Sequence, residues 1–473
     1  MRRTLARIGL SLLVLAGPTV ALSGSPEPVA AAQKKPNVVI ILTDDQRYDT
    51  LSAMPKVQNL LVNRGVQFNQ GFVTNSLCCP SRTSILTGNY SHTTGIWRDN
   101  PPFGGYETFS TNGDQQSTLA TWLHSDGYNT ALFGKYLNGY KDDASASVIP
   151  PGWDSWNAFD RAGYYNYHAF VDNKFEAFGH HPRDYSTEVI ADEASNYIRN
   201  TKSPFFMYFA PYSPHRPAIP SPKYQNTYRN LKPFRAPGYD EHDVSDKPQW
   251  LQKDVPLLTP ERERAVQDFR RRQYQTLTSA DNAVGKIMSA LNQTGELSNT
   301  IIFFLSDNGQ ARGEHRWTSK KVAYEPSIRV PYVVRYDPLT RHASVDNSDM
   351  VLNIDIAPTI AELAGAKAPH MDGQSLVPLL DGTADSWRQD FLIEHLSKNK
   401  SQIPPTFCAV RSTDYLYVYY STGDEELYNL KQDPAELRNR VDDPDLDIIR
   451  AQMHSRLKQL CSPHPPGLHI HGI

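Results

Sequence analysis

Two unbroken apolar runs, far apart in the chain, constrain the fold more than any other feature of the sequence. Residues 38–42 read VVIIL, and residues 301–305 read IIFFL. A strand with one wet face alternates apolar and polar residues, whereas a parallel strand covered on both faces is apolar throughout. The two runs therefore predict strands buried on both faces of an α/β sheet.

Polar side chains follow these runs and two further ones, residues 130–133 and 205–209. In chain order, the four ends carry Asp44 and Asp45, Lys135, His215, and Asp307 and Asn308. Open parallel α/β sheets bind ligands beyond the carboxyl ends of their strands. We therefore expect the six side chains to converge on one crevice.

Helical segments are predicted between the strands, at residues 117–125, 260–292 and 353–365, and this alternation favours a largely parallel sheet. Beyond residue 385 the pattern changes to four short strands and a helix. These elements are expected at residues 391–394, 406–411, 416–420, 426–430 and 446–460. The predicted domains are a main domain, 33–385, and a C-terminal subdomain, 386–473.

Two long connections rich in aromatic residues and proline, 139–184 and 211–254, are candidates for substrate loops. The aromatic side chains Tyr164, Tyr165 and Tyr167 fit either a sugar-stacking platform or ordinary core packing.

Asp44, Asp45, Asp307 and Asn308 offer oxygen donors, with no cysteine or histidine beside them in the sequence of the kind that zinc prefers. Hard oxygen ligands suit calcium, with magnesium as the second choice. The adjacent Asp44 and Asp45 would also fit the cap of a following helix. The second pair, after a second strand, favours a metal site.

Residues 78–88 read CCPSRTSILTG. This run resembles the signature of the formylglycine-dependent sulfatases, C-x-P-S-R followed three residues later by L-T-G. The resemblance implies that a formylglycine-generating enzyme converts Cys78 to 3-oxoalanine (formylglycine). One hydroxyl of the hydrated aldehyde would attack sulfur and the other would later expel the sulfate. The alternative is two buried thiols before a helix capped by Ser81 or Thr83, a description that suits Cys79.

A second signature of the same family, G-Y-x-T-x-x-x-G-K, matches residues 127–135. The family resemblance implies an alkaline-phosphatase-like α/β sandwich: a large, mostly parallel sheet flanked by helices, plus a small C-terminal antiparallel sheet with one helix. It also implies the divalent-cation ligands, which are Asp44, Asp45, Asp307, Asn308 and the modified Cys78.

The resemblance assigns roles to the cationic residues as well. Lys135 would contact formylglycine and sulfate, and Arg82 would steady the aldehyde hydrate. His215 and Lys320 would hold the sulfate and the bridging oxygen, with His215 favoured as the proton donor to the leaving alcohol. Lys321 competes with Lys320, which is preferred because it stands four residues before Tyr324.

Many sulfatases carry a histidine where this chain has Leu137. The base for sulfate elimination is therefore unassigned, with Asn138, His92 and His315 as candidates. The surrounding sequence resembles the N-acetylglucosamine-6-sulfatase branch. The segments that carry this resemblance are 76–82, 134–138, 150–156, 215–220, 243–248, 324–331 and 426–430 with 433–434.

Residues 1–32 are predicted to be a signal peptide, with a basic start, an apolar stretch at 8–22 and small residues at 30–32. We expect an exported protein, secreted or associated with the cell surface, with no transmembrane segment in its mature chain. Of the four cysteines, Cys408 and Cys461 form the plausible disulfide, and two free thiols are the alternative.

The formal net charge of −3 gives no case for nucleic acid as a partner. The expected activity is hydrolysis of sulfate esters, with a sugar 6-sulfate as the first choice of substrate and aryl sulfates as surrogates. A phosphomonoester or phosphonate hydrolase of the same fold remains as an alternative, as does a non-catalytic carbohydrate-binding relative.

Overall fold

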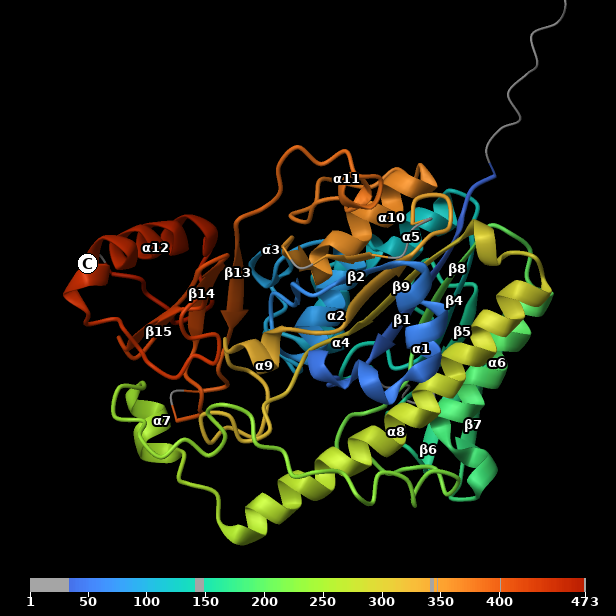
Figure 1. Ribbon diagram of the computed structural model, residues 1–473. Coiled ribbons are helices and arrows are strands. Elements are labelled where there is room, and N and C mark those ends of the chain that lie inside the picture. Colours follow the sequence, from blue (N-terminus) through green and yellow to red (C-terminus); the bar gives the residue numbers. More distant parts are fainter. Residues whose placement is uncertain (1–33, 141–148, 341–343, 347, 400, 472–473) are drawn as a thin grey trace, which may run out of the picture. The chain divides into compact units, whose positions relative to one another are not determined.

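The computed structural model in Figure 1 describes residues 34–140, 149–340, 344–346, 348–399 and 401–471. The expected signal peptide lies outside these ranges. Residues Lys35–Ile473 form one compact unit, and a division near residue 385 stays a prediction. Within the described ranges, no helix is both long and apolar enough to span a membrane.

The main sheet has eight strands, in the order β11-β2-β10-β9-β1-β8-β4-β5. Strands β9, β1, β8, β4 and β5 run parallel to one another, whereas β10 is antiparallel to both of its neighbours. The predicted large, mostly parallel sheet is therefore confirmed. The bounds are β1 (Asn37–Thr43), β2 (Val66–Phe68), β4 (Asn129–Gly134), β5 (Ser155–Ala158), β8 (Phe205–Ala210), β9 (Thr300–Ser306), β10 (Tyr332–Arg335) and β11 (Ser344–Asp346).

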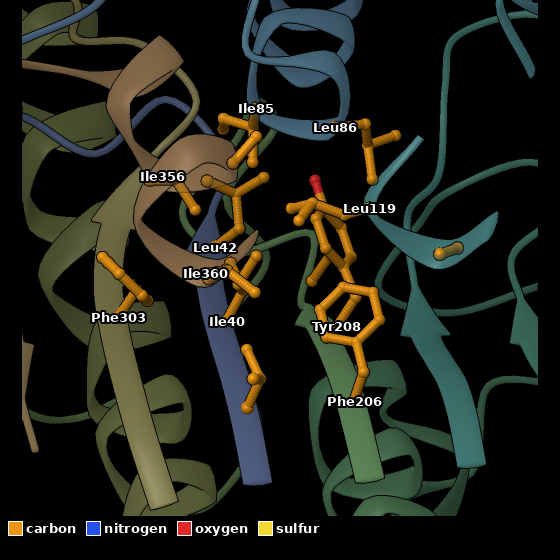
Figure 2. Close-up of a cluster of buried hydrophobic side chains, with 14 of the residues drawn as sticks. Ile40, Leu42, Ile85, Leu86, Leu119, Phe206, Tyr208, Phe303, Ile356 and Ile360 are labelled. Carbon is orange, nitrogen blue, oxygen red and sulfur yellow. The ribbon is translucent and has the colours of Figure 1, made fainter. Parts of the chain in front are cut away.

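Alternate residues of each central strand face opposite layers of helices, which explains the unbroken apolar runs. On one face Val38, Ile40 and Leu42 pack against α2 (Cys78–Thr87), α5 (Leu119–Ser125) and α10 (Ile356–Ala364). Figure 2 shows part of this core, with side chains from β1, β8 and the covering helices in contact. On the other face Val39 and Ile41 pack with α1 (Pro55–Leu60), α6 (Ser186–Asn200) and α8 (Pro260–Gln293).

The C-terminal part contains the predicted antiparallel sheet and its helix (Figure 1). Its elements are β13 (Asp390–His395), β14 (Phe407–Ser412), β15 (Tyr415–Tyr420), β16 (Glu425–Asn429) and α12 (Asp447–Leu460). A disulfide joins Cys408 on β14 to Cys461, directly after α12, so the bridge is formed rather than two free thiols.

A buried carboxylate connects this sheet to the main part of the molecule. Glu426 is fully buried and accepts hydrogen bonds from the hydroxyl groups of Tyr324, Tyr420 and Tyr428, at 2.7, 2.7 and 2.5 Å. Tyr324 belongs to the main part and stands four residues after Lys320. The hydrogen bond from Tyr324 to Glu426 therefore holds the chain in place four residues after Lys320.

The remaining elements are short, and four of them form two-stranded sheets of their own, β12 with β3 and β6 with β7. They are β3 (Gly71–Phe72), β6 (Tyr167–Val171), β7 (Lys174–Phe178), β12 (Val351–Leu352), α3 (Ser91–Thr94), α4 (Gly105–Thr111), α7 (Gln249–Asp254), α9 (Glu325–Ile328) and α11 (Val377–Leu380). Short 3-10 turns occupy Tyr48–Ala53, Val62–Arg64, Asp114–Gln116, Pro182–Asp184, Leu297–Asn299, Asn353–Asp355 and Pro444–Leu446. Tyr164 and Tyr167 are buried, so these two aromatic side chains belong to the core.

Candidate active site

The site lies at the carboxyl ends of four adjacent parallel strands, β9, β1, β8 and β4. The structure brings the side chains that follow these strands together with Cys78, Arg82 and Lys320. Cys78 opens α2, and its residue is 2 % exposed. Its Sγ lies 3.5 Å from Asp44 Oδ1 and 2.8 Å from Lys320 Nζ.

The alternative of helix capping fails for this part of the chain. The turn after β1 begins at Tyr48, and its N-cap, Arg47, makes no side-chain capping bond. Helix α2 begins after Leu77, so neither Ser81 nor Thr83 is its N-cap. Asp44 and Asp45 instead point their carboxylates at cationic side chains.

Asp44, Lys135 and Arg82 form one half of the site. Lys135 Nζ donates to Asp44 Oδ2 at 2.6 Å, and Arg82 Nη2 lies 3.5 Å from the same oxygen. Lys135 follows Gly134, which adopts a φ of 108°, and a Cβ there would lie 2.2 Å from the carbonyl oxygen of Ala210. The sequence therefore needs glycine at this position to turn Lys135 into the site.

Asp307 is held by the same arginine. Arg82 Nε donates to Asp307 Oδ2 at 2.8 Å, and Arg82 Nη1 donates to the carbonyl oxygen of Lys135 at 2.8 Å. The other oxygen of Asp307 accepts the backbone N–H of Asp45 at 3.1 Å. Arg82 thus contacts residues at the carboxyl ends of three strands, β1, β9 and β4.

Asp45, Lys320 and Asn308 form the other half. Asp45 has a positive φ of 63°, an uncommon conformation for a non-glycine residue that aims its side chain at this cluster. Lys320 Nζ donates to Asp45 Oδ1 at 2.5 Å and lies 3.5 Å from Asn308 Oδ1. Asn308 Nδ2 donates to Asp45 Oδ1 at 2.6 Å.

His215 reaches the site from the loop after β8. Its Nε2 lies 3.6 Å from Asp45 Oδ2, while its Nδ1 contacts the carbonyl oxygen of Arg216 at 2.6 Å. Since a carbonyl oxygen only accepts, Nδ1 carries a proton and Nε2 is the nitrogen that faces the site. The side chain is 25 % exposed, which leaves it open to a ligand.

Charge pairing sets the protonation states. Burial acts to raise the pKa of Asp44, but Lys135, His215 and Arg82 outweigh it and lower the pKa to about 2. Burial likewise opposes ionisation of Asp45, and Lys320 and His215 lower its pKa. Burial would lower the pKa values of Lys135 and Lys320, yet Asp44 and Asp45 respectively raise them. The two carboxylates and the two ammonium groups are therefore charged at neutral pH.

The buried carboxylates at this position fit a hard divalent cation, and the structure places a thiol and an imidazole beside them. Asp44, Asp45, Cys78 and His215 each offer one ligand atom, and the four atoms lie within 4.8 Å of one another. Ligand atoms about 2.3–2.6 Å from a calcium ion lie within such a separation. The carboxylates are buried and already ionised, as metal ligands must be. Asn308 lies beside this group, and Asp307 is directed mainly at Arg82 and the Asp45 N–H.

A cavity of about 570 Å³ opens beside the cluster. Lys135 and His215 line it, and its other walls come mainly from the connection 139–184 that the sequence marks as a candidate substrate loop. The volume lies in the range of about 300–1,000 Å³ that is common for small-molecule sites. Sequence reasoning missed Tyr212, Asp160, Arg161 and His168 among its lining residues. Tyr212 could have been predicted, since it stands only two residues after the carboxyl end of β8.

The three candidates for the eliminating base lie in different places. Asn138 lines the cavity. His92 Nδ1 instead pairs with Glu394 at 3.1 Å, and His315 Nδ1 pairs with Glu241 at 2.7 Å. Neither histidine is among the residues that line this cavity, so Asn138 is the one candidate of the three that faces it.

Known proteins are similar to this chain in sequence and in architecture. Residues 36–366 match the family model described as Sulfatase, and residues 313–462 match the model described as N-sulphoglucosamine sulphohydrolase, C-terminal. The chain is similar to N-acetylglucosamine-6-sulfatase of Homo sapiens, with 32 % identity over 94 % of this chain and 88 % of that protein.

Two further proteins extend the comparison. The chain is 33 % identical to the extracellular sulfatase SULF-1 homolog of Drosophila melanogaster over 79 % of its own length, but spans only 34 % of that longer protein. A solved structure described as a complex with its substrate D-glucosamine-2-N,6-O-disulfate superposes with a TM-score of 0.78. The two sequences are 24 % identical, and the match covers 90 % of this chain and 97 % of that one.

Proposed function

Because this chain belongs to the sulfatase family and is a sulfuric ester hydrolase, we propose that it removes the 6-sulfate of a glucosamine residue through a formylglycine made from Cys78. The observation that carries the proposal is the position of Cys78, whose Sγ contacts both Asp44 and Lys320. Asp44 in turn pairs with Lys135, which lines the cavity. Relatives named N-acetylglucosamine-6-sulfatase support the choice of ester.

The formylglycine would supply the nucleophile for sulfur, and a divalent cation, calcium in our proposal, would draw charge from the sulfate oxygens. Asp44, Asp45, Asp307 and Asn308 would hold that cation together with the modified Cys78. The carboxylates and Asn308 are buried. Arg82 positions Asp44 and Asp307, the N–H of Asp45 donates to Asp307, and Asn308 donates to Asp45. The site is therefore organised before the substrate arrives.

Lys135 and Lys320 bind the oxygens of the sulfate group, where negative charge must be stabilised during the S–O cleavage. In its doubly protonated form His215 would give the proton on Nε2 to the oxygen of the leaving alcohol, since that nitrogen faces the site and the carbonyl of Arg216 fixes the ring. Arg82 acts through Asp44 and Asp307, whose carboxylates it positions. The products are the sugar alcohol and inorganic sulfate, with one water consumed.

We further propose that the protein is exported. A disulfide between Cys408 and Cys461 is typical of an oxidising compartment, and some relatives are named extracellular sulfatases. Maturation would then require an encounter with a formylglycine-generating enzyme before the buried segment at Cys78 folds.

The substrate assignment is tested by comparing esters in one assay. We expect sulfate release from N-acetylglucosamine 6-sulfate and, less efficiently, from an aryl sulfate. The corresponding aryl phosphate should be the poorer ester. A higher kcat/KM for the phosphate than for every sulfate ester would instead favour a phosphomonoester hydrolase.

Adjacent lysines provide a matched test of the cationic residues. Lys320→Ala should lower kcat/KM by about 10²- to 10³-fold, because it removes an ammonium group that faces the developing charge. Lys321→Ala is the control, since Lys320 and not Lys321 contacts Cys78 and Asp45. Steady-state kinetics on both variants, with thermal unfolding to check the fold, would measure the difference. Equal losses in the two variants would refute the assignment.

A further inference from the structure

An arginine on the cavity wall has no role in the proposed reaction. Arg161 lines the cavity together with Lys135 and His215, and its side chain is exposed. Among the residues that the structure describes, no carboxylate lies within ion-pairing distance of its guanidinium. Among the described residues that line the cavity, Asp160 is the only acidic one, and it lies 3.8 Å from Nδ1 of His168.

The sheet places Arg161 one strand away from Lys135. Gly134 of β4 and Ala158 of β5 are directly opposite each other, and Phe159 donates its N–H to the carbonyl oxygen of Gly134 at 2.8 Å. Lys135 and Phe159 therefore follow paired residues of neighbouring strands, about 4.8 Å apart. Strands β4 and β5 lie side by side in Figure 1. Arg161 stands two residues after Phe159, so two cationic groups face one cavity from adjacent strand ends.

The two cations have different surroundings. Lys135 is buried and neutralised by Asp44 at 2.6 Å, as expected for a group that acts on the reacting sulfate. Arg161 has no such partner among the residues that the structure describes, so its charge is available to a ligand. A guanidinium binds planar or tetrahedral oxyanions through paired N–H donors, which makes sulfate and carboxylate groups its preferred ligands.

We propose that Arg161 forms a subsite for a second anionic group of the substrate, a sulfate or a carboxylate beside the ester that is cleaved. This inference rests on the proposed function and deepens it. The preferred substrate is then a sugar with at least two anionic groups, or a 6-sulfated sugar linked to a uronic acid. Arg161 determines specificity and does not touch the reacting atoms.

The test compares three substrates with wild-type enzyme and with Arg161→Gln. The substrates are N-acetylglucosamine 6-sulfate, glucosamine 2-N,6-O-disulfate and a disaccharide that joins a 6-sulfated glucosamine to a uronic acid. We expect Arg161→Gln to lower kcat/KM by about 10- to 100-fold, mainly through KM, for the substrates that carry a second anion. The singly sulfated sugar should change by less than about 3-fold. Loss on the disulfated sugar alone would identify a sulfate subsite, and loss on the disaccharide alone a carboxylate subsite.

Two control variants make the outcome specific. Arg161→Lys keeps the charge without the paired donors and should recover part of the loss. Arg183→Gln removes a guanidinium whose side chain is 86 % exposed and outside the cavity lining, and it should change nothing. Equal kinetics of Arg161→Gln and wild type on all three substrates would overturn the subsite. A wild-type enzyme that cleaves none of the sulfate esters would instead overturn the proposed function.

Discussion

Replacing Cys78 with alanine is expected to lower kcat/KM for sulfate esters by about four orders of magnitude or more, because it removes the precursor of the nucleophile. The side chain lies where the proposed reaction takes place, in contact with Asp44 and Lys320. The same change removes only a small buried group, so the fold should survive. Steady-state kinetics and the thermal unfolding midpoint of the variant measure the two effects separately.

The neighbouring cysteine is the matched control. Cys79 is also fully buried, but it packs in the hydrophobic core with Leu86 and Leu137, and its N–H donates to Asp99. Cys79→Ala should therefore keep the catalytic rate and cost about 1 kcal/mol of unfolding free energy through lost packing. A Cys79→Ala enzyme as inactive as Cys78→Ala would mean that the segment as a whole, rather than the group at Cys78, is needed.

Removal of the divalent cation should have the second largest effect. A chelator is expected to abolish most of the activity, and added calcium to restore it. Asp45→Ala should lower kcat/KM by about 10³-fold without rescue by calcium, since Asp45 is proposed to be a direct ligand. Calorimetric titration with calcium provides a readout besides activity, and the variant should bind the ion far more weakly than wild type.

Asp49 provides the control for this experiment. It lies four residues after Asp45 and is also ionised, because Arg47 and Arg312 outweigh burial and lower its pKa to about 2. Its partners are structural, with Arg47 donating two hydrogen bonds to its carboxylate. Asp49→Ala should therefore retain calcium binding and activity. Full activity of chelator-treated wild-type enzyme, with no calcium bound, would contradict a cation-dependent reaction.

The sequence predicts the parts of the fold that depend on local pattern. The runs at 38–42 and 301–305 are apolar because both faces of β1 and β9 are covered, and this requirement is visible without a structure. Helix α8 was also predictable from the sequence, since its N-terminus at Pro260 follows the capping side chain of Thr259. By contrast, the apolar sequence of β10 does not indicate the direction in which the strand runs. Its antiparallel pairing with β9 was therefore not predictable.

The site shows the same division. Residues placed directly after strands, such as Asp44 and Asp307, could be predicted to lie close together, because parallel strands end at one edge of the sheet. Tertiary pairing decided the rest. His92 pairs with Glu394, which is 302 residues away in the chain, and His315 pairs with Glu241, which is 74 residues away. Arg161 was not singled out either, because only the folded protein shows that none of the described carboxylates pairs with it.

The mass of the peptide that contains Cys78 tests the central claim most directly. Trypsin cleaves after Arg64 and Arg82, and the peptide 65–82 between them contains Cys78 and Cys79. In protein exported by its native host and alkylated after unfolding, we expect one labelled cysteine, at Cys79. At Cys78 we expect a residue lighter than cysteine, because an aldehyde has replaced the thiol-bearing methylene. An active enzyme in which both cysteines carry the label would contradict the mechanism.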